Sequence, residues 1–422
     1  MRYRFLIVVV CYCISSLLVS LGNEQSNGFF LGSRPSTVSE IASKAGSEAR
    51  APRDLGLAQD VSELQSYLYP DELVLIYRLQ EPNSECLVIG QTSVRTLTLS
   101  DQTHIEALVD RYRREIQSKD SGFTLARELY GLLLGSIQEI KKSPRITIVA
   151  DGKLHLLPFE ALVGPEGDYL IVSHLVDYSP SATVFSMTRR ESATRRGKLP
   201  FLGIGDVPPR SLRDGGAFFE FKNARLNPLP ATKDEIMTIS ELVGNRSIQL
   251  LGEHATEGAL KALPLSEFQI LHFAVHGISS EGRPNRSALV LASNPETGED
   301  GLLEASEISD LDLNADLVVL SGCDTGLGDF VQADGVANLA RSFLLAGAKT
   351  VVASLWGADD YYTRTLMKRF YSYLVQGMDK GSALRLAKVT LINFYGREKA
   401  LPVYWAGFVM TGESSTPVFA EP

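Results

Sequence analysis

Between Ala231 and Gly412, short runs of apolar residues alternate with segments in which apolar residues recur every three or four positions. Buried strands separated by amphipathic helices are typical of a mostly parallel sheet covered by helices on both faces. We therefore expect an α/β fold here. The expected strands are "SIQLLG", "FQILHFAVHG", "SALVLA", "ADLVVLSGC", "TVVASLW" and "VYWAGFVM", and the expected helices span about 231–243, 256–262, 336–346, 360–375 and 380–394.

Residues 66–230 show a different order, which predicts a smaller α+β part in front of a core at 231–412. "ELVLIYRL" and "ECLVIGQTSVRTLTL" are bounded by Pro, Asn and Ser and predict a hairpin. Two helical patterns follow, at about 101–118 and 122–140.

The rest of this part predicts connections more than regular elements. In "RITIVADGKLHLLPFEAL" a strand runs into Asp151-Gly152, a dipeptide typical of hairpin turns. The basic, Gly- and Pro-bearing stretch from about 190 to 227 predicts a long surface connection. Within it, Gly203-Ile204-Gly205 lacks the third glycine of a dinucleotide-binding loop, and we interpret it as at most a turn.

The two ends of the chain predict no part of the core. Residues 1–22 combine Arg2 and Arg4 with an apolar run and then small residues, which is typical of a secretory signal. We expect a secreted or periplasmic protein; the alternative is an uncleaved membrane anchor. Residues 23–65 are rich in Ser, Gly, Ala and Pro and predict a flexible linker, and 413–422 form a tail.

Charge and cysteine content limit the classes of function. The formal net charge is −9 and no Lys/Arg run is present, which argues against nucleic acid as a partner. Beyond the signal segment the cysteines are Cys86 and Cys323. Two cysteines do not make a disulfide framework: they could pair once, or either could be a thiol with a chemical role.

Two expected strands end in residues that carry chemistry. "ILHFAVHG" ends in His276, and "DLVVLSGCDTG" brings Cys323 47 positions further along the chain. If these strands are parallel neighbours, both side chains emerge at the same edge of the sheet. A thiol beside an imidazole is the pair needed for nucleophilic acyl chemistry. The backbone N–H groups of Gly277 and Cys323 are then candidates for an oxyanion hole.

Other catalytic or metal sites fit these residues less well. All six histidines precede Cys323, which excludes the residue order of α/β-hydrolases and of papain-like peptidases. His272 and His276 have the spacing of a helical zinc motif, yet the glutamate of that motif is missing and the residues between them favour a strand. We expect no metal and no cofactor, and we expect His272 to be structural.

The chain resembles the CHAT domain, a family of caspase- and separase-like cysteine peptidases. This resemblance implies a caspase-like three-layer sandwich with a mostly parallel central sheet, with His276 as general acid/base and Cys323 as nucleophile. The matching motifs are "DGKLHLLPFEAL" (151–162), "YSPSAT" (178–183), "LPATKDEI" (229–236), "ILHFAVHG" (270–277), "VVLSGCDTG" (318–326), "GVANLARSFLLAGAKTVVASLWGADD" (335–360) and "VYWAGFVMTG" (403–412).

The resemblance also implies a specificity pocket. In the related separases an acidic residue soon after a Leu-Trp strand end meets the arginine that precedes the cleaved bond. "SLWGADD" has Asp360 at the matching offset, with Asp359 beside it, and Ser354 belongs to the same predicted substrate-binding set. A carboxylate pairs well with a guanidinium, so cleavage after Arg or Lys is expected. The alternative is that Asp359 or Asp360 caps the next helix.

Partners follow from this resemblance, with one departure. Members of the family often carry helical repeats of about 34 residues, and the sequence shows none. We expect a protein or peptide substrate, with an activating protein as a further candidate partner and contact with a membrane only through an uncleaved N-terminal segment. A catalytically silent scaffold and an acyltransferase that uses the same thioester chemistry are the alternatives.

Overall fold

The computed structural model describes residues 56–191, 197–208, 226, 229–278, 287–294, 298–322, 333–357, 359–396 and 399–419. The predicted signal segment and most of the predicted linker lie outside these residues. Backbone contacts divide the chain into Met1–Arg53 and Asp54–Pro422, and the described residues belong to the second unit. In the described part, no helix is long and apolar enough to cross a membrane.

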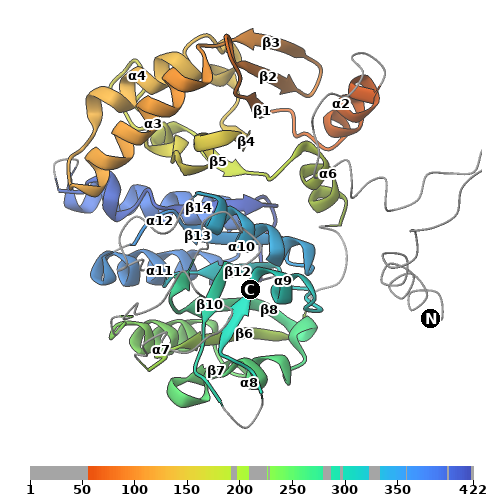
Figure 1. The fold of residues 1–422 in the computed structure, drawn as a ribbon, viewed down its shortest axis with the longest axis vertical. Helices are drawn as coiled ribbons and strands as arrows, with labels where there is room; N and C mark the ends of the chain where they lie inside the picture. The colour runs from red at the N-terminus through yellow and green to blue at the C-terminus, as the bar shows by residue number, and fades with distance from the viewer. Residues whose placement is uncertain are drawn as a thin grey trace, which may run out of the picture. The chain divides into compact units, whose positions relative to one another are not determined.

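One large sheet runs through this unit (Figure 1). Its eleven strands lie in the order β3-β2-β1-β4-β5-β14-β13-β12-β8-β6-β7. Most neighbours are parallel; β2 pairs antiparallel with both β1 and β3, and β14 pairs antiparallel with β13. The strands are β1 (Glu72–Arg78), β2 (Glu85–Gly90), β3 (Val94–Thr98), β4 (Arg145–Val149), β5 (Leu175–Tyr178), β6 (Leu199–Gly205), β7 (Ile248–Leu251), β8 (Phe268–Ala274), β12 (Leu317–Leu320), β13 (Thr350–Ser354) and β14 (Phe408–Gly412).

Helices connect these strands, and a second, small sheet has the order β11-β10-β9. Its strands are β9 (Gly277–Ile278), β10 (Ala288–Val290) and β11 (Leu302–Glu304). The α-helices are α2 (Gly56–Ser66), α3 (Gln102–Gln117), α4 (Phe123–Leu133), α5 (Leu170–Ser173), α6 (Ala182–Glu191), α7 (Thr232–Val243), α8 (Glu257–Lys261), α9 (Ala305–Ser309), α10 (Ala333–Leu345), α11 (Asp360–Val375) and α12 (Lys380–Tyr395). The 3₁₀ helices are η1 (Gln138–Lys142), η2 (Gly152–Leu156), η3 (Phe159–Ala161), η5 (Gly252–His254), η6 (Leu265–Glu267) and η8 (Pro402–Tyr404).

Side chains alternate in direction along each strand, and their contacts show which helices cover each face of the sheet. On β8, Ile270 packs into a core with residues of α7, α11 and α12, whereas Leu271 and Phe273 pack into a second core with residues of α8, α9 and α10. Successive side chains of a strand point to opposite faces, so a buried strand must be apolar on both. The predicted α/β class, with helices on both faces of a mostly parallel sheet, is therefore confirmed.

Several predicted elements of the N-terminal part are confirmed as well. β1 and β2 form the predicted antiparallel hairpin, and β3 extends it. The predicted helices at 101–118 and 122–140 are α3 and α4, although α4 ends at Leu133 and η1 follows it. The predicted linker ends earlier than expected, because α2 already begins at Gly56.

The interpretation of Gly203-Ile204-Gly205 as at most a turn is wrong, because these residues end strand β6. This strand lies between β7 and β8, parallel to both. A Cβ atom at Gly203 would lie 2.6 Å from Ile236 Cγ2, so the glycine allows α7 to approach the strand closely. In sequence β6 belongs to the predicted N-terminal part, yet it pairs with strands of the predicted core.

The hairpin predicted at Asp151-Gly152 is also wrong. β4 has parallel neighbours on both sides, β1 and β5, so no hairpin partner can pair with it. The apolar residues after the turn form η2 and η3 instead. The Asp151 carboxylate accepts the N–H of Leu79 at 2.7 Å and that of Gly152 at 2.9 Å, which stabilises the end of the strand.

A buried ion pair links α12 to η3 and, through a backbone carbonyl, to β14. Lys388 on α12 is 1% exposed, and its Nζ donates to Glu160 Oε1 at 2.7 Å and to the carbonyl oxygen of Phe408. Glu160 also accepts from the hydroxyl of Tyr178 at 2.7 Å. When one partner of such a pair is removed, an uncompensated charge remains in the core.

We predict that Lys388→Met lowers the free energy of unfolding by about 3–5 kcal/mol, because Glu160 loses its buried counter-charge. Urea denaturation followed by circular dichroism measures this. The matched control is Lys153→Met, whose partner Asp110 lies 2.5 Å away in a half-exposed pair, and there we expect a loss below about 1 kcal/mol. Equal losses in the two variants would contradict the prediction.

Candidate active site

Strands β8 and β12 bring the two predicted catalytic segments together. They are parallel neighbours, as the sequence analysis required. Leu317 pairs with Ile270, Val319 with His272, and every pair in this register is 47 positions apart. This offset equals the separation of His276 and Cys323 in the sequence. Cys323 itself lies outside the described residues.

The described chain continues the β12 register past the end of the strand. The N–H of Ser321 donates to the carbonyl oxygen of Phe273 at 3.0 Å. A Cβ atom at Gly322 would lie 2.4 Å from the backbone nitrogen of Val275 and 2.5 Å from its carbonyl oxygen. Backbone atoms cannot give way as a flexible side chain can, so glycine at this position lets β12 lie against the chain that leads into His276.

His276 is held by the small sheet. Its carbonyl oxygen accepts the N–H of Val290 at 2.8 Å, and Gly277 begins β9, where it pairs with Leu289 of β10. The His276 residue is 8% exposed. The chain therefore leaves the large sheet at Val275 and enters the small sheet at Gly277. The backbone of His276 is held between these two hydrogen-bonded sheets.

His272 is a buried core residue. Its ring is completely buried: Nδ1 lies 2.8 Å from the Tyr371 hydroxyl, while Nε2 lies 2.8 Å from Glu235 Oε1 and 2.9 Å from Ser321 Oγ. With both ring nitrogens engaged by protein groups, His272 is not available as a zinc ligand beside His276.

Sequence reasoning missed the other members of this hydrogen-bonded group. Glu235 belongs to α7 and Tyr371 to α11, far from His272 in sequence, and both are buried. Burial, followed by the nearby Glu235 carboxylate, raises the pKa of Tyr371 well above its ordinary value. The one available signal was "Ser321-Gly322-Cys323", a polar residue directly after a fully apolar strand.

The predicted substrate-binding residues lie where β13 passes into α11. Ser354 is buried at the end of β13, and its hydroxyl donates to the carbonyl oxygen of Trp356 at 2.6 Å. Asp359 is the N-cap of α11, and its carboxylate accepts the N–H groups of Tyr361 at 3.1 Å and Tyr362 at 3.4 Å. The side chain of Asp360 lies outside the described residues.

Cys86 lies on β2, far across the sheet from the end of β12. Six strand positions separate β2 from β12, about 29 Å at the usual strand spacing. A disulfide requires Cα atoms within about 7 Å, and Cys323 is one residue beyond Gly322. An intramolecular Cys86–Cys323 disulfide is therefore excluded. Burial also raises the pKa of the Cys86 thiol to about 12, so that thiol stays protonated.

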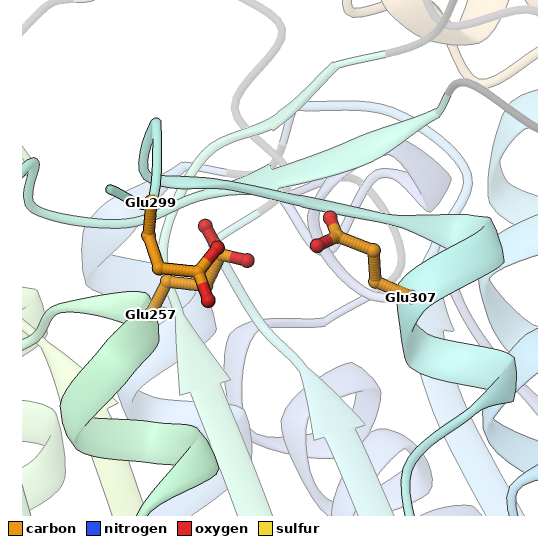
Figure 2. A group of neighbouring side chains, drawn as sticks. All are labelled: Glu257, Glu299 and Glu307. Atoms are coloured by element: carbon orange, nitrogen blue, oxygen red, sulfur yellow. The ribbon is translucent and has the colours of Figure 1, made fainter. Parts of the chain in front are cut away.

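One acidic cluster deserves comparison with a metal site. Figure 2 shows the carboxylates of Glu257, Glu299 and Glu307, which offer oxygen atoms within 4.8 Å of one another. The ammonium group of Lys261 lies 2.6, 3.2 and 2.9 Å from them, respectively. Burial raises the pKa of Glu257 to about 7, against the opposing effect of Lys261. Because the one ammonium group contacts all three carboxylates, we interpret the cluster as a salt-bridge network around α8.

We predict that Gly322→Ala destabilises the protein by about 1–3 kcal/mol, because the added methyl group meets backbone atoms of Val275. The control is Gly131→Ala in α4, where a Cβ atom would have nothing within 4 Å. There the helix should gain about 0.5–1 kcal/mol. Urea denaturation gives both signs, and a neutral Gly322→Ala would contradict the close contact between the strands.

We predict that Cys86 does not react with iodoacetamide at pH 8 in the folded protein, because its thiol is buried and its pKa is about 12. In urea the same thiol should react at the ordinary rate. Mass spectrometry of proteolytic peptides measures both reactions. Rapid alkylation of Cys86 without urea would show that β2 opens to solvent.

Comparisons with known proteins agree with the recognised motifs. A family model described as "CHAT domain" matches residues 124–413. Tetratricopeptide repeat protein 28 of Homo sapiens is 26% identical over 333 residues, and that of Mus musculus is 25% identical over 338 residues. Each alignment covers 68% of this chain but 13% of the relative, so the chain corresponds to a small part of these proteins.

The solved structures that resemble this one have lower sequence identity than these relatives. Separase of Saccharomyces cerevisiae, in complex with securin, is 11% identical with a TM-score of 0.48, over 85% of this chain and 31% of that one. Gingipain R of Porphyromonas gingivalis, an Arg-specific cysteine proteinase, is 9% identical with a TM-score of 0.41, over 75% of each chain. Because the family model matches more than half of the residues of this chain, the chain belongs to the CHAT domain family.

Proposed function

We propose that the protein is a cysteine endopeptidase in which His276 is the general acid/base and Cys323 the nucleophile. The observation that carries this proposal is the register of β8 and β12, whose pairs are all 47 positions apart. Past the strand ends Gly322 still lies against Val275, which has the same offset, so the two chains run side by side up to the residue before each proposed catalytic position. The CHAT family match spans both of these positions, and the family resemblance implies this pair.

The proposed reaction follows the chemistry of a thiol beside an imidazole. His276 takes the proton of Cys323, and the thiolate sulfur forms a bond to the carbonyl carbon of the scissile amide. His276 then gives that proton to the leaving amine as the C–N bond breaks. Water hydrolyses the thioester and restores the thiol. The N–H groups of Gly277 and Cys323 are the proposed donors to the oxyanion, each worth about 3–4 kcal/mol of transition-state stabilisation.

We assign the preference for arginine or lysine before the cleaved bond to Asp360. Asp359 already accepts two N–H groups as the N-cap of α11, and the Ser354 hydroxyl donates to a carbonyl within its own chain. Asp360 is the first residue of α11, and it stands at the offset after Leu-Trp at which the related separases carry the acidic residue of their pocket. A carboxylate there would bind a guanidinium through two parallel hydrogen bonds.

A noncatalytic scaffold is the second candidate function. Its support is that the curated relatives are named for tetratricopeptide repeats, a name that describes repeats rather than peptidase chemistry. In this candidate the domain would bind a protein partner, and His276 would stabilise the fold without turning over a substrate.

We predict that the full chain cleaves fluorogenic peptides carrying Arg or Lys before the reporter group, and that Cys323→Ala and His276→Ala each lower kcat at least about a thousandfold, because each removes one member of the dyad. Peptides with Asp or Leu at that position test the specificity, both with and without cell extract as a source of an activator. Cleavage that survives Cys323→Ala would exclude the proposed nucleophile. No cleavage under any condition would favour the scaffold.

We predict that Asp360→Asn lowers kcat/KM for the Arg peptide about a hundredfold relative to the Leu peptide, because the guanidinium loses its counter-charge. Asp359→Asn is the matched comparison, since asparagine is an equally good N-cap. A larger loss in Asp359→Asn than in Asp360→Asn would move the pocket to the neighbouring residue. Equal Arg and Leu rates in the wild type would exclude the pocket.

A further inference from the structure

The buried group formed by Ser321, His272, Glu235 and Tyr371 lies along β8 and at the end of β12, the two strands that the proposed dyad residues follow in sequence. Side chains of a strand alternate between faces, so His272 and Ala274 share the face of β8 that carries α7 and α11, where Ala274 also packs. Ser321 contacts His272 on that face. Ser321 thus precedes the proposed nucleophile Cys323 by two residues, and His272 precedes His276 by four.

Two of the contacts of His272 fall on one ring nitrogen. Burial and the Glu235 carboxylate raise the pKa of Tyr371, so its hydroxyl keeps its proton, 2.8 Å from Nδ1 of His272. Nε2 of the same ring lies 2.8 Å from Glu235 Oε1 and 2.9 Å from Ser321 Oγ. These contacts run from α11 through β8 to α7 and to the residue that follows β12.

The same contacts exclude a second catalytic centre. In a serine-histidine-acid triad the serine and the acid bind opposite nitrogens of the imidazole. Here Glu235 and Ser321 both lie at Nε2, and a tyrosine is at Nδ1. Ser321 is 6% exposed and His272 is fully buried. The group has neither the connectivity nor the access of a hydrolytic site.

A purely stabilising role explains the group poorly. Buried polar networks contribute little net stability, and apolar residues of the same size are often as good. Hydrogen bonds fix the orientation of the side chains that they join, because each bond constrains an angle as well as a distance. Apolar packing does not fix orientation in this way. The group lies at the end of β12, two residues before Cys323. At this point the orientation of the chain affects the orientation of the proposed nucleophile.

We infer that His272 is a positioning residue: held by Glu235 and Tyr371, it orients Ser321 and thereby the chain that enters Cys323 relative to His276. This inference rests on the proposed function. It adds that helices α7 and α11, which cover one face of the sheet, control the distance between His276 and Cys323.

The test uses the full chain and two readouts. The first is the rate of Cys323 alkylation by iodoacetamide as a function of pH, which reports the thiolate without any substrate. The second is kcat and KM for the Arg peptide. The variants are Ser321→Ala and Tyr371→Phe, each of which removes one hydroxyl. The controls are Ser321→Thr, which keeps the hydroxyl, and Tyr373→Phe, which removes the α11 hydroxyl that faces Thr390.

In the wild type we expect the midpoint of alkylation well below about 8.5, the ordinary thiol value. Ser321→Ala and Tyr371→Phe should raise it, slow alkylation at pH 7 about tenfold and lower kcat about tenfold, with KM within about twofold. Both control variants should match the wild type. Circular dichroism confirms that each variant is folded.

Three outcomes separate the claims. An ordinary thiol profile in the wild type would overturn the proposed dyad. A lowered midpoint that is unchanged in Ser321→Ala and Tyr371→Phe would overturn the positioning role alone. A Ser321→Thr variant as impaired as Ser321→Ala would show that packing, and not the hydrogen bond, is responsible.

Discussion

The parallel pairing of β8 with β12 is the constraint on which the rest of the candidate site depends. Its register brings two segments that are 47 positions apart in sequence to one edge of the sheet. Gly322 permits that pairing to continue beyond the strand, because a side chain there would meet the backbone of Val275. A slip of one residue would exchange the side chains that pack against α7 and α11 with those that pack against α8, α9 and α10, so the close packing of the two cores holds the register.

Much of this arrangement could be predicted from the sequence, because the strands of the core are almost wholly apolar and the helices between them are amphipathic. Such patterns are local, and so are strand ends followed by His276-Gly277. β6 was missed because its glycines, which here make room for α7, are also the commonest residues of turns. A local pattern cannot state which helix will approach which strand.

The hydrogen-bonded group around His272 illustrates a different limit. Its members come from α7, β8, the end of β12 and α11, and each is unremarkable in its own segment. Glu235 falls within the first turn of a helix, where acidic residues are common, and Tyr371 falls within an apolar stripe. Their meeting is a product of helix packing on a shared face, which a single sequence does not encode in any periodic signal.

The antiparallel strand β14 divides the sheet into two blocks of opposite direction. β8, β12 and β13 end at one edge, whereas β4 and β5 end at the other. The motifs that follow β4 and β5, at 151–162 and 178–183, therefore lie at the edge away from His276. Their polar members Glu160 and Tyr178 are buried in contacts with each other and with the core. Two of the motifs that the chain shares with the CHAT family thus serve the packing of the sheet, and they lie away from His276.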